Sequence, residues 1–265
     1  MGEGTMLLKD KVVIVTGIGP GMGAKMARDA AAAGAKVVMV SRSDFVMKDV
    51  LAAILESGGT AIAVQGDVSK QEDCDAVAAK AVETFGRIDG LINSAYYHPP
   101  MVPLLDNDAE DLRLAFDVIV AGALNMIRAV RPQMQKQGGG AVVNIGTMAN
   151  RKPLMGEGGY VLAKGALASL TRQLALELGP EGIRVNMTVM GWLGGPATDM
   201  FFEWKAMSSG RTKDEAVAEA VARIALGRIP PDEECGRAAL MLLSDFAVQV
   251  TGAMLDVNGG EYMPA

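Results

Sequence analysis

Short apolar runs alternate with longer helical stretches along this chain, and the alternation limits the folds open to it. The runs are rich in β-branched residues and have no polar face, which is typical of strands buried on both sides in a parallel sheet. They cover residues 12–15, 37–40, 61–64, 90–93, 141–145, 183–186 and 254–257. Helices are predicted over residues 21–33, 70–85, 108–137 and 160–178. The pattern predicts an α/β fold, a doubly wound sheet with helices on both sides.

Length and composition fit one such domain over residues 1–265 and exclude several classes of protein. Half of the residues are hydrophobic, which is enough for a large core. The formal charge of -6 argues against a nucleic-acid partner and against an anionic membrane surface. Residues 1–10 lack the apolar run of a signal peptide, and no segment is long and apolar enough for a membrane helix. Two cysteines and one histidine form no metal or disulfide pattern, so we expect a cytoplasmic protein without a metal.

A glycine-rich turn follows the first predicted strand and precedes the first predicted helix. The turn contains Gly17, Gly19, Pro20, Gly21, Met22 and Gly23. Glycines let the backbone approach a pyrophosphate, and the free N–H groups and dipole of a helix N-terminus favour its negative charge. The turn therefore predicts a dinucleotide-binding loop. The competing interpretation is that the glycines serve only a tight turn.

The end of the second predicted strand distinguishes between two dinucleotides. NAD sites usually carry an acidic residue here for the ribose hydroxyls, whereas an arginine accommodates the 2′-phosphate of NADP. Ser41 offers no carboxylate to repel that phosphate, and Arg42 offers a planar guanidinium to bind it. The sequence therefore favours NADP(H), with NAD(H) possible. The alternative is that Arg42 is a solvated surface side chain.

Tyr160 and Lys164 stand at positions i and i+4 of a predicted helix, so their side chains share one face. A free tyrosine has a pKa of about 10, and a neighbouring ammonium together with an oxidised nicotinamide would lower it. Tyr160 would then exchange a proton with a carbonyl or alcohol oxygen. With the glycine turn, the pair predicts an oxidoreductase acting on a small molecule. The alternative is a tyrosine and a lysine on an ordinary helix face.

The chain resembles the short-chain dehydrogenase/reductase family over nearly its whole length. The motifs are Thr16-Gly17-x-x-x-Gly21-x-Gly23, Gly66-Asp67-Val68, Tyr160-x-x-x-Lys164, Arg184-Val185-Asn186 and Asn258-Gly259-Gly260. The resemblance implies a single Rossmann domain with a seven-stranded parallel sheet, in a homotetramer or dimer. It also implies that Tyr160, Lys164 and Thr147 are catalytic, with Thr147 in place of the family's serine. The implied cofactor-binding residues are Gly17, Gly19, Pro20, Gly21, Met22, Gly23, Ser41, Arg42, Asp67, Val68, Asn93, Ser94, Ala95, Tyr160, Lys164 and Gly191.

Several positions depart from the family's pattern. Tyr96 stands where the family usually has glycine, which puts bulk beside the cofactor. Ile119 replaces the family's active-site asparagine, so the amide that helps hold a proton-relay water is absent. The threonine that usually contacts the nicotinamide carboxamide falls at Gly194 or Gly195, with Thr198 as a nearby substitute. These departures keep a second hypothesis open: a family member that binds cofactor but hardly turns over and acts as a binding or regulatory protein.

The pocket wall predicted from the sequence is rich in methionine and aromatic residues. The expected substrate contacts are Tyr96, Met148, Met155, Trp192 and Met200, and the wider wall adds Tyr97, His98, Met101, Asn150, Phe201 and Trp204. Methionine suits irregular apolar surfaces, so these residues favour a bulky apolar ketone or secondary alcohol, such as a steroid-like or polycyclic one, unless the methionines are plain core. His98 either touches substrate or, as its Pro-rich loop favours, is a solvated side chain.

Residues 194–228 interrupt the alternation between the last two predicted strands. The segment begins with two glycines and a proline, and a helix is predicted within it over residues 214–224. It forms either a substrate lid or a plain pair of packed surface helices.

Overall fold

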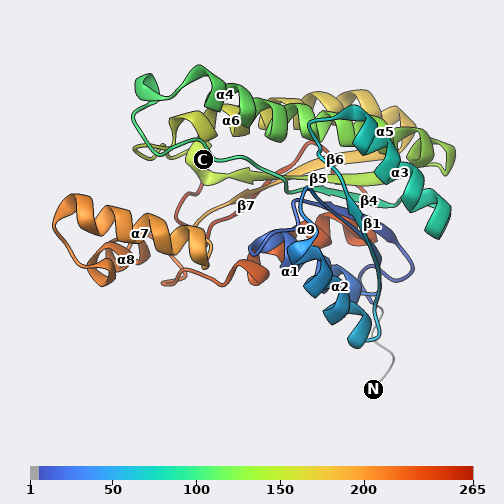
Figure 1. The fold of residues 1–265 in the computed structure, drawn as a ribbon, viewed down its shortest axis with the longest axis horizontal. Coiled ribbons are helices and arrows are strands. Elements are labelled where there is room, and N and C mark those ends of the chain that lie inside the picture. The colour runs from blue at the N-terminus through green and yellow to red at the C-terminus, as the bar shows by residue number, and fades with distance from the viewer. Residues whose placement is uncertain (1–5, 265) are drawn as a thin grey trace.

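The sheet is parallel throughout in the computed structural model, which describes residues 6–264. Its seven strands run in the order β3-β2-β1-β4-β5-β6-β7 (Figure 1). They are β1 (Val12–Thr16), β2 (Lys36–Ser41), β3 (Thr60–Gln65), β4 (Gly90–Asn93), β5 (Gly140–Thr147), β6 (Ile183–Met190) and β7 (Met254–Val257). The predicted seven-stranded, doubly wound sheet is therefore confirmed.

Two layers of helices cover the sheet (Figure 1). One face carries α1 (Met22–Ala32), α2 (Phe45–Glu56) and α9 (Asp232–Leu243), and the other carries α3 (Gln71–Phe85), α4 (Ala109–Phe116), α5 (Gly122–Lys136) and α6 (Gly158–Leu178). Successive strand residues point to opposite faces. Val13 and Val15 accordingly join the core under α1, whereas Val12 and Ile14 join the core under α3. Strands enclosed on both sides need apolar residues at every position, which explains the unbroken apolar runs.

The observed elements differ from the predicted ones at a few places. Helix α2 was not predicted, and β5 and β6 each extend past the expected end. The long predicted helix over residues 108–137 is divided by a π-helical segment, Asp117–Ala121. Asp108 caps its start by accepting a hydrogen bond from the backbone N–H of Glu110 at 2.8 Å.

The strand order reverses between β1 and β4, and this is where open α/β sheets bind ligands. Thr16 joins the two strands at that point. Its hydroxyl donates to the Ile92 carbonyl at 3.3 Å and accepts from the backbone N–H groups of Ser94 and Ala95 at 3.1 and 3.3 Å. Thr16, which opens the glycine-rich motif, therefore ties the end of β1 to the end of β4 at the base of the crevice.

The described residues contain no membrane-spanning helix, metal-ligating cluster or disulfide. No helix within residues 6–264 is long and apolar enough to cross a membrane, and no cluster of metal-ligating side chains occurs in the same range. Cys74 and Cys235 are both buried free thiols. The expected lack of a signal peptide concerns residues 1–10, of which 1–5 lie outside the described residues.

Candidate functional site

The turn after β1 depends on glycine at two positions. Gly17 has a φ of +76°, and a Cβ atom there would lie 2.6 Å from backbone atoms of Ala95. A Cβ atom on Gly23 would lie 2.3 Å from the Gly17 carbonyl oxygen. Around Gly19, by contrast, no described atom lies within 4 Å of such a Cβ atom. The first and last glycines therefore allow close backbone packing, and Gly19 leaves open space above the loop.

A cavity of about 420 Å³ opens beside this turn. Its lining consists of Gly17, Ile18, Gly19, Val40, Ser41, Arg42, Gly66, Asp67, Val68, Ala95, Tyr96, Tyr97, His98 and Val118. Most of the predicted cofactor positions at strand ends thus meet in one cavity. The others in the turn, Pro20, Gly21, Met22 and Gly23, lie at the start of α1 next to it.

Two predicted cofactor residues have their side chains elsewhere. The amide of Asn93 donates to Asn144 Oδ1 at 2.9 Å, and the amide of Asn144 donates to Thr171 Oγ1 at 2.9 Å. This network places the Asn93 side chain between the sheet and α6. Ser94 is buried and contacts Thr16 through its backbone.

Arg42 and Asp67 determine the charge on the rim of this cavity. Arg42 follows β2 with an exposed side chain. Asp67 Oδ1 accepts hydrogen bonds from the backbone N–H and the hydroxyl of Ser69 at 3.0 and 2.7 Å. Burial acts to raise the pKa of Asp67, but these bonds and the positive charges of Arg42 and Lys70 hold it below its ordinary value. The rim thus presents a guanidinium beside an ionised carboxylate.

A second cavity, of about 500 Å³, adjoins the first and shares Tyr96 and His98 with it. Its lining consists of Tyr96, His98, Pro99, Pro100, Met101, Thr147, Met148, Ala149, Leu154, Glu157, Met190, Gly191, Trp192, Leu193, Thr198, Met200 and Phe201. Four of the expected substrate contacts are present, together with Gly191, which was predicted to bind cofactor. Met155 is 79% exposed and is not in the lining; nor are Asn150 and Trp204, while Tyr97 lines the first cavity.

Lys164 lies close to Tyr160, and Thr147 lines the second cavity. Lys164 Nζ is 5.5 Å from the centre of the Tyr160 ring and donates to the Ile145 carbonyl at 2.6 Å. Thr147 ends β5, and its hydroxyl accepts from the backbone N–H of Ala149 at 3.2 Å. Tyr160 is absent from the described lining of both cavities. Lys164 is thus in contact with the Tyr160 ring, whereas Thr147 lies in the wall of the second cavity.

The lowering of the Tyr160 pKa that is expected from a neighbouring ammonium together with an oxidised nicotinamide stays a prediction. Burial raises the pKa of Tyr160 above its ordinary value of 10, and charge on Tyr96 and Glu157 raises it further. Burial also lowers the pKa of Lys164 from 10.5 to about 7. Enclosure in protein disfavours both charged forms, and one lysine near the ring does not offset that cost.

Ile119 belongs to the apolar wall around this pair. It is 2% exposed and packs in a cluster with Met148, Ala163 and Leu167. The family's asparagine would place an amide at this position, whereas Ile119 adds only hydrocarbon. The apolar cluster that contains Ile119 therefore borders Tyr160 without offering it an amide.

His98 is not the solvated loop side chain that its sequence context favours. Its Nδ1 lies 2.7 Å from the Pro99 carbonyl, and its Nε2 lies 2.9 Å from Glu157 Oε2. Its ring stacks on that of Tyr160, with centres 4.8 Å apart and planes at 19°. Glu157 escaped the sequence analysis because its contact is with a distant loop. The available signal was its place one turn before Tyr160, at the start of α6.

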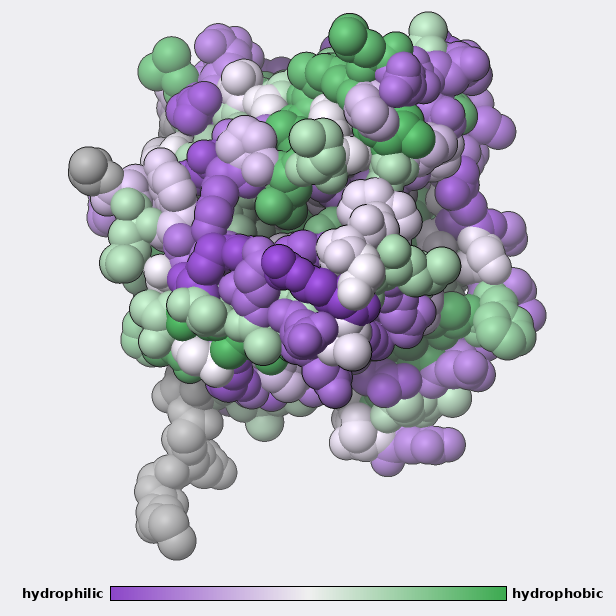
Figure 2. Space-filling model, turned by 90° about the vertical axis from the view of Figure 1, so that its left-hand side faces the viewer, coloured by the Kyte–Doolittle hydropathy of each residue, from purple (hydrophilic) through white to green (hydrophobic). Residues whose placement is uncertain are grey.

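Residues 194–228 form a helix pair beside the second cavity. Helix α7 (Pro196–Ser209) supplies Thr198, Met200 and Phe201 to the cavity lining. Helix α8 (Lys213–Val221), predicted over residues 214–224, packs against α7 around the buried Phe202. Figure 2 shows a hollow on this side of the molecule, between an apolar upper part and a hydrophilic band over α7 and α8.

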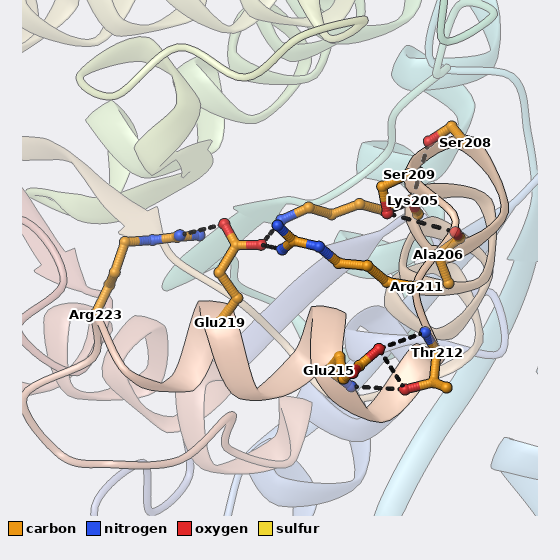
Figure 3. Close-up of polar contacts among 9 residues, drawn as sticks. All are labelled: Lys205, Ala206, Ser208, Ser209, Arg211, Thr212, Glu215, Glu219 and Arg223. Atoms are coloured by element: carbon orange, nitrogen blue, oxygen red, sulfur yellow. Dashed lines mark hydrogen bonds and ion pairs between the residues drawn. The ribbon is translucent and has the colours of Figure 1, made fainter.

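An ion cluster centred on Glu219 connects the two helices (Figure 3). The carboxylate accepts from Lys205 at 3.1 Å, from Arg211 at 3.0 Å and from Arg223 at 2.9 Å. At the start of α8, Thr212 and Glu215 form a capping box. Aromatic packing of Trp192 on Phe202, with ring centres 5.0 Å apart, joins the pair to the segment after β6. The pair is thus internally linked, and the residues after α8 also bond to the C-terminal segment, Arg223 to Glu261 and the Leu226 N–H to the Gly259 carbonyl.

Comparison with known proteins gives one consistent family. A family model described as enoyl-(acyl carrier protein) reductase matches residues 17–261. The short-chain reductase protein NovJ of Streptomyces niveus is 35% identical over 95% of this chain and 94% of the relative. The L-rhamnose 1-dehydrogenase (NAD(P)(+)) of a Sphingomonas species is 34% identical over 97% of this chain and 98% of the relative. The crystal structure of levodione reductase superposes with a TM-score of 0.88 at 28% identity, covering 96% of this chain and 98% of that one. The chain therefore belongs to the short-chain dehydrogenase/reductase family and is an NAD(P)-dependent oxidoreductase.

Proposed function

We propose that this protein interconverts a ketone and a secondary alcohol with NADP(H), using Tyr160, Lys164 and Thr147. The observation that carries the proposal is the junction of two cavities. One is lined by the glycine turn and by Arg42, the other by Thr147 and apolar side chains, and they share Tyr96 and His98. A dinucleotide in the first cavity and an apolar substrate in the second would meet at that boundary, where Tyr160 packs against both shared residues.

The residues present fit a dinucleotide. Because Gly17 and Gly23 have no side chains, the turn packs closely against its neighbours. A pyrophosphate could then approach the free N–H groups at the start of α1. Asp67, Val68 and Ala95 would hold the adenosine half, and Arg42 with Ser41 the 2′-phosphate. When bound, the nicotinamide supplies or accepts the hydride.

The chain's own residues would handle the proton and the orientation of the substrate. Tyr160 donates its phenolic proton to the carbonyl oxygen in reduction and removes it from the alcohol in oxidation. Thr147, which lines the substrate cavity, holds the same oxygen through its hydroxyl. Lys164 is held by the Ile145 carbonyl below the Tyr160 ring, and in its protonated form it favours the phenolate.

The second cavity favours a bulky apolar substrate, such as a steroid-like or polycyclic ketone. Met148, Trp192 and Met200 supply large apolar surfaces to it, as the sequence analysis expects. We further propose that residues 194–228 act as a lid on a single domain, because α7 lines this cavity while pairing mainly with α8. A homotetramer or dimer remains the expectation from the family resemblance, and a cytoplasmic location remains the expectation from the two cysteines and the sequence of residues 1–10.

Replacing Arg42 by alanine is expected to raise KM for NADPH by about 10- to 100-fold and to leave KM for NADH nearly unchanged. Arg42 lines the cavity beside the glycine turn, where its guanidinium would pair with the 2′-phosphate, and such charged hydrogen bonds contribute about 1.5–3 kcal/mol. Steady-state kinetics with each cofactor check this. Lys48→Ala, which removes an exposed cation from α2, is the matched control. An equal change for both cofactors would contradict the assignment of Arg42.

The test of the function is turnover by the purified protein on a panel of small and bulky ketones and alcohols, with NADP(H) and NAD(H) in parallel. Turnover of bulky apolar members with NADP(H) supports the whole proposal. Turnover with NAD(H) alone keeps the enzyme and removes the 2′-phosphate argument. If neither cofactor is consumed while both still bind, the non-catalytic binding or regulatory role, which Ile119 favours, takes its place.

A further inference from the structure

His98, which stacks on the Tyr160 ring, forms a polar pair with Glu157 in a cavity that is otherwise largely apolar. His98 lies in the loop after β4, and Glu157 directly precedes α6. Both line the proposed substrate cavity, with side-chain exposures of 32% and 11%. Gly159 lets the two segments approach, because a Cβ atom there would lie 3.1 Å from Pro99 Cγ. The pair therefore joins the cofactor-side loop to the start of the helix that carries Tyr160.

The partners of the imidazole determine its protonation. The Pro99 carbonyl at 2.7 Å can only accept, so Nδ1 must carry a hydrogen. Nε2 then faces a carboxylate oxygen at 2.9 Å, which also accepts when ionised. A hydrogen bond there requires a proton shared by His98 and Glu157. Although burial alone would lower it, the bond and charge of Glu157 raise the pKa of His98 above 6.5.

We propose that His98 and Glu157 are positioning residues for the proton transfer at Tyr160: their shared proton holds the imidazole against the phenol ring and balances the carboxylate charge beside it. The proposal deepens the proposed function and rests on it. The stack, with ring centres 4.8 Å apart, fixes the ring of Tyr160 from one side, and Tyr96 meets it edge-on at 6.3 Å. Ile119 packs in the same apolar cluster as Tyr160 and offers the ring no amide.

The charged and titratable groups that face Tyr160 come from two elements. Tyr96 and His98 belong to the loop after β4, and Glu157 and Lys164 to the start of α6. The negative charge of Glu157 acts against the phenolate. With its proton the pair is neutral, and without it the pair leaves one negative charge beside the phenol. Losing the shared proton should therefore make Tyr160 a weaker acid.

The first test reads the pair directly and needs no turnover. Because the chain has one histidine, its imidazole signals in an NMR titration of the ¹⁵N-histidine-labelled protein belong to His98 alone. We expect both nitrogens to be protonated near pH 6.5 and the pKa to lie above that of a free histidine. In Glu157→Gln the amide keeps a hydrogen-bonding group but no charge, so the pKa should fall by about one unit or more. Glu177→Gln, at the exposed end of α6, should leave it unchanged. A His98 pKa at or below 6.5 in the wild-type protein would contradict a proton shared with Glu157.

The second test asks whether the pair acts on Tyr160. Phenolate absorbance of the protein saturated with NADP⁺, taken as a difference against Tyr160→Phe, gives the Tyr160 midpoint whether or not a substrate has been found. In Glu157→Gln the midpoint should move to lower pH by about one unit, and the pH profile of alcohol oxidation should follow it. In His98→Gln the carboxylate stays without its cation, so the midpoint should not fall. If the Tyr160 midpoint shifts equally in both variants, or in neither, the pair has a merely structural role and the proposal is overturned. If only the substrate panel shows no turnover, the proposed reaction is overturned and this proposal is not.

Discussion

Replacing Tyr160 by phenylalanine is expected to lower kcat by about 10²- to 10⁴-fold, the usual worth of a positioned general acid or base. The change removes one oxygen atom and keeps the ring that stacks on His98 and meets Tyr96. Cofactor binding should therefore persist, because the glycine turn and Arg42 lie in the other cavity. Turnover under saturating cofactor and substrate, with binding measured by calorimetry, checks both parts.

The control for this variant is Tyr262→Phe. Tyr262 packs against the same core cluster as Tyr160, and its ring lies 5.5 Å from the guanidinium of Arg151. Removing its hydroxyl should leave kcat within about a factor of two, because Tyr262 lines neither of the two described cavities. Residual turnover of Tyr160→Phe within tenfold of the parent would show that another group carries the proton. Equal losses in both variants would point to a general effect on folding.

Replacing Gly17 by alanine is expected to destabilise the protein by about 3 kcal/mol and to weaken cofactor binding severely. The φ of +76° is strained for alanine, and its Cβ atom would lie 2.6 Å from Ala95 backbone atoms that are held by Thr16. Relief requires β1 and β4 to move apart at the crevice where the cofactor is expected. Thermal unfolding without cofactor should show a Tm lower by about 6–12 °C.

Gly19→Ala is the matched variant in the same turn. Gly19 does not have a positive φ, and the space around its Cβ position is open among the described residues. Its Tm without cofactor should stay within about 2 °C of the parent, because no contact has to change. Similar losses of Tm at both positions would contradict the view that close packing against Ala95, rather than flexibility of the turn, requires Gly17.

The sheet was predictable from the sequence because its physical cause is local composition. A strand covered on both faces must be apolar throughout, and β1 and β4 show this plainly. Helix α2 was missed because it also carries apolar residues on its exposed side: Phe45 is 76% and Leu55 is 53% exposed. With apolar residues on both sides, the segment lacks the amphipathic 3.6-residue period by which the other helices were predicted. The division of the long helix by a π-helical segment likewise left no local signal that we used.

Part of the candidate site was likewise predictable from local sequence, and part was not. Short-range rules sufficed for the glycine turn and for Tyr160 with Lys164, because one helix turn places i and i+4 on the same face. They could not give the pKa of Lys164, about 7, because it follows from burial of the ammonium in the folded chain. The side chain of Asn93 also turned out to bond within the core.

The sequence by itself thus determined the α/β class, the dinucleotide turn and the tyrosine–lysine pair, each of which depends on residues adjacent along the chain. Only the tertiary structure decided that His98 is bonded to Glu157 and stacked on Tyr160. It also decided that α7 borders the second cavity. The reason is that a contact between distant segments depends on how the whole sheet and its helices pack, and burial, which controls the charges at this site, exists only after that packing.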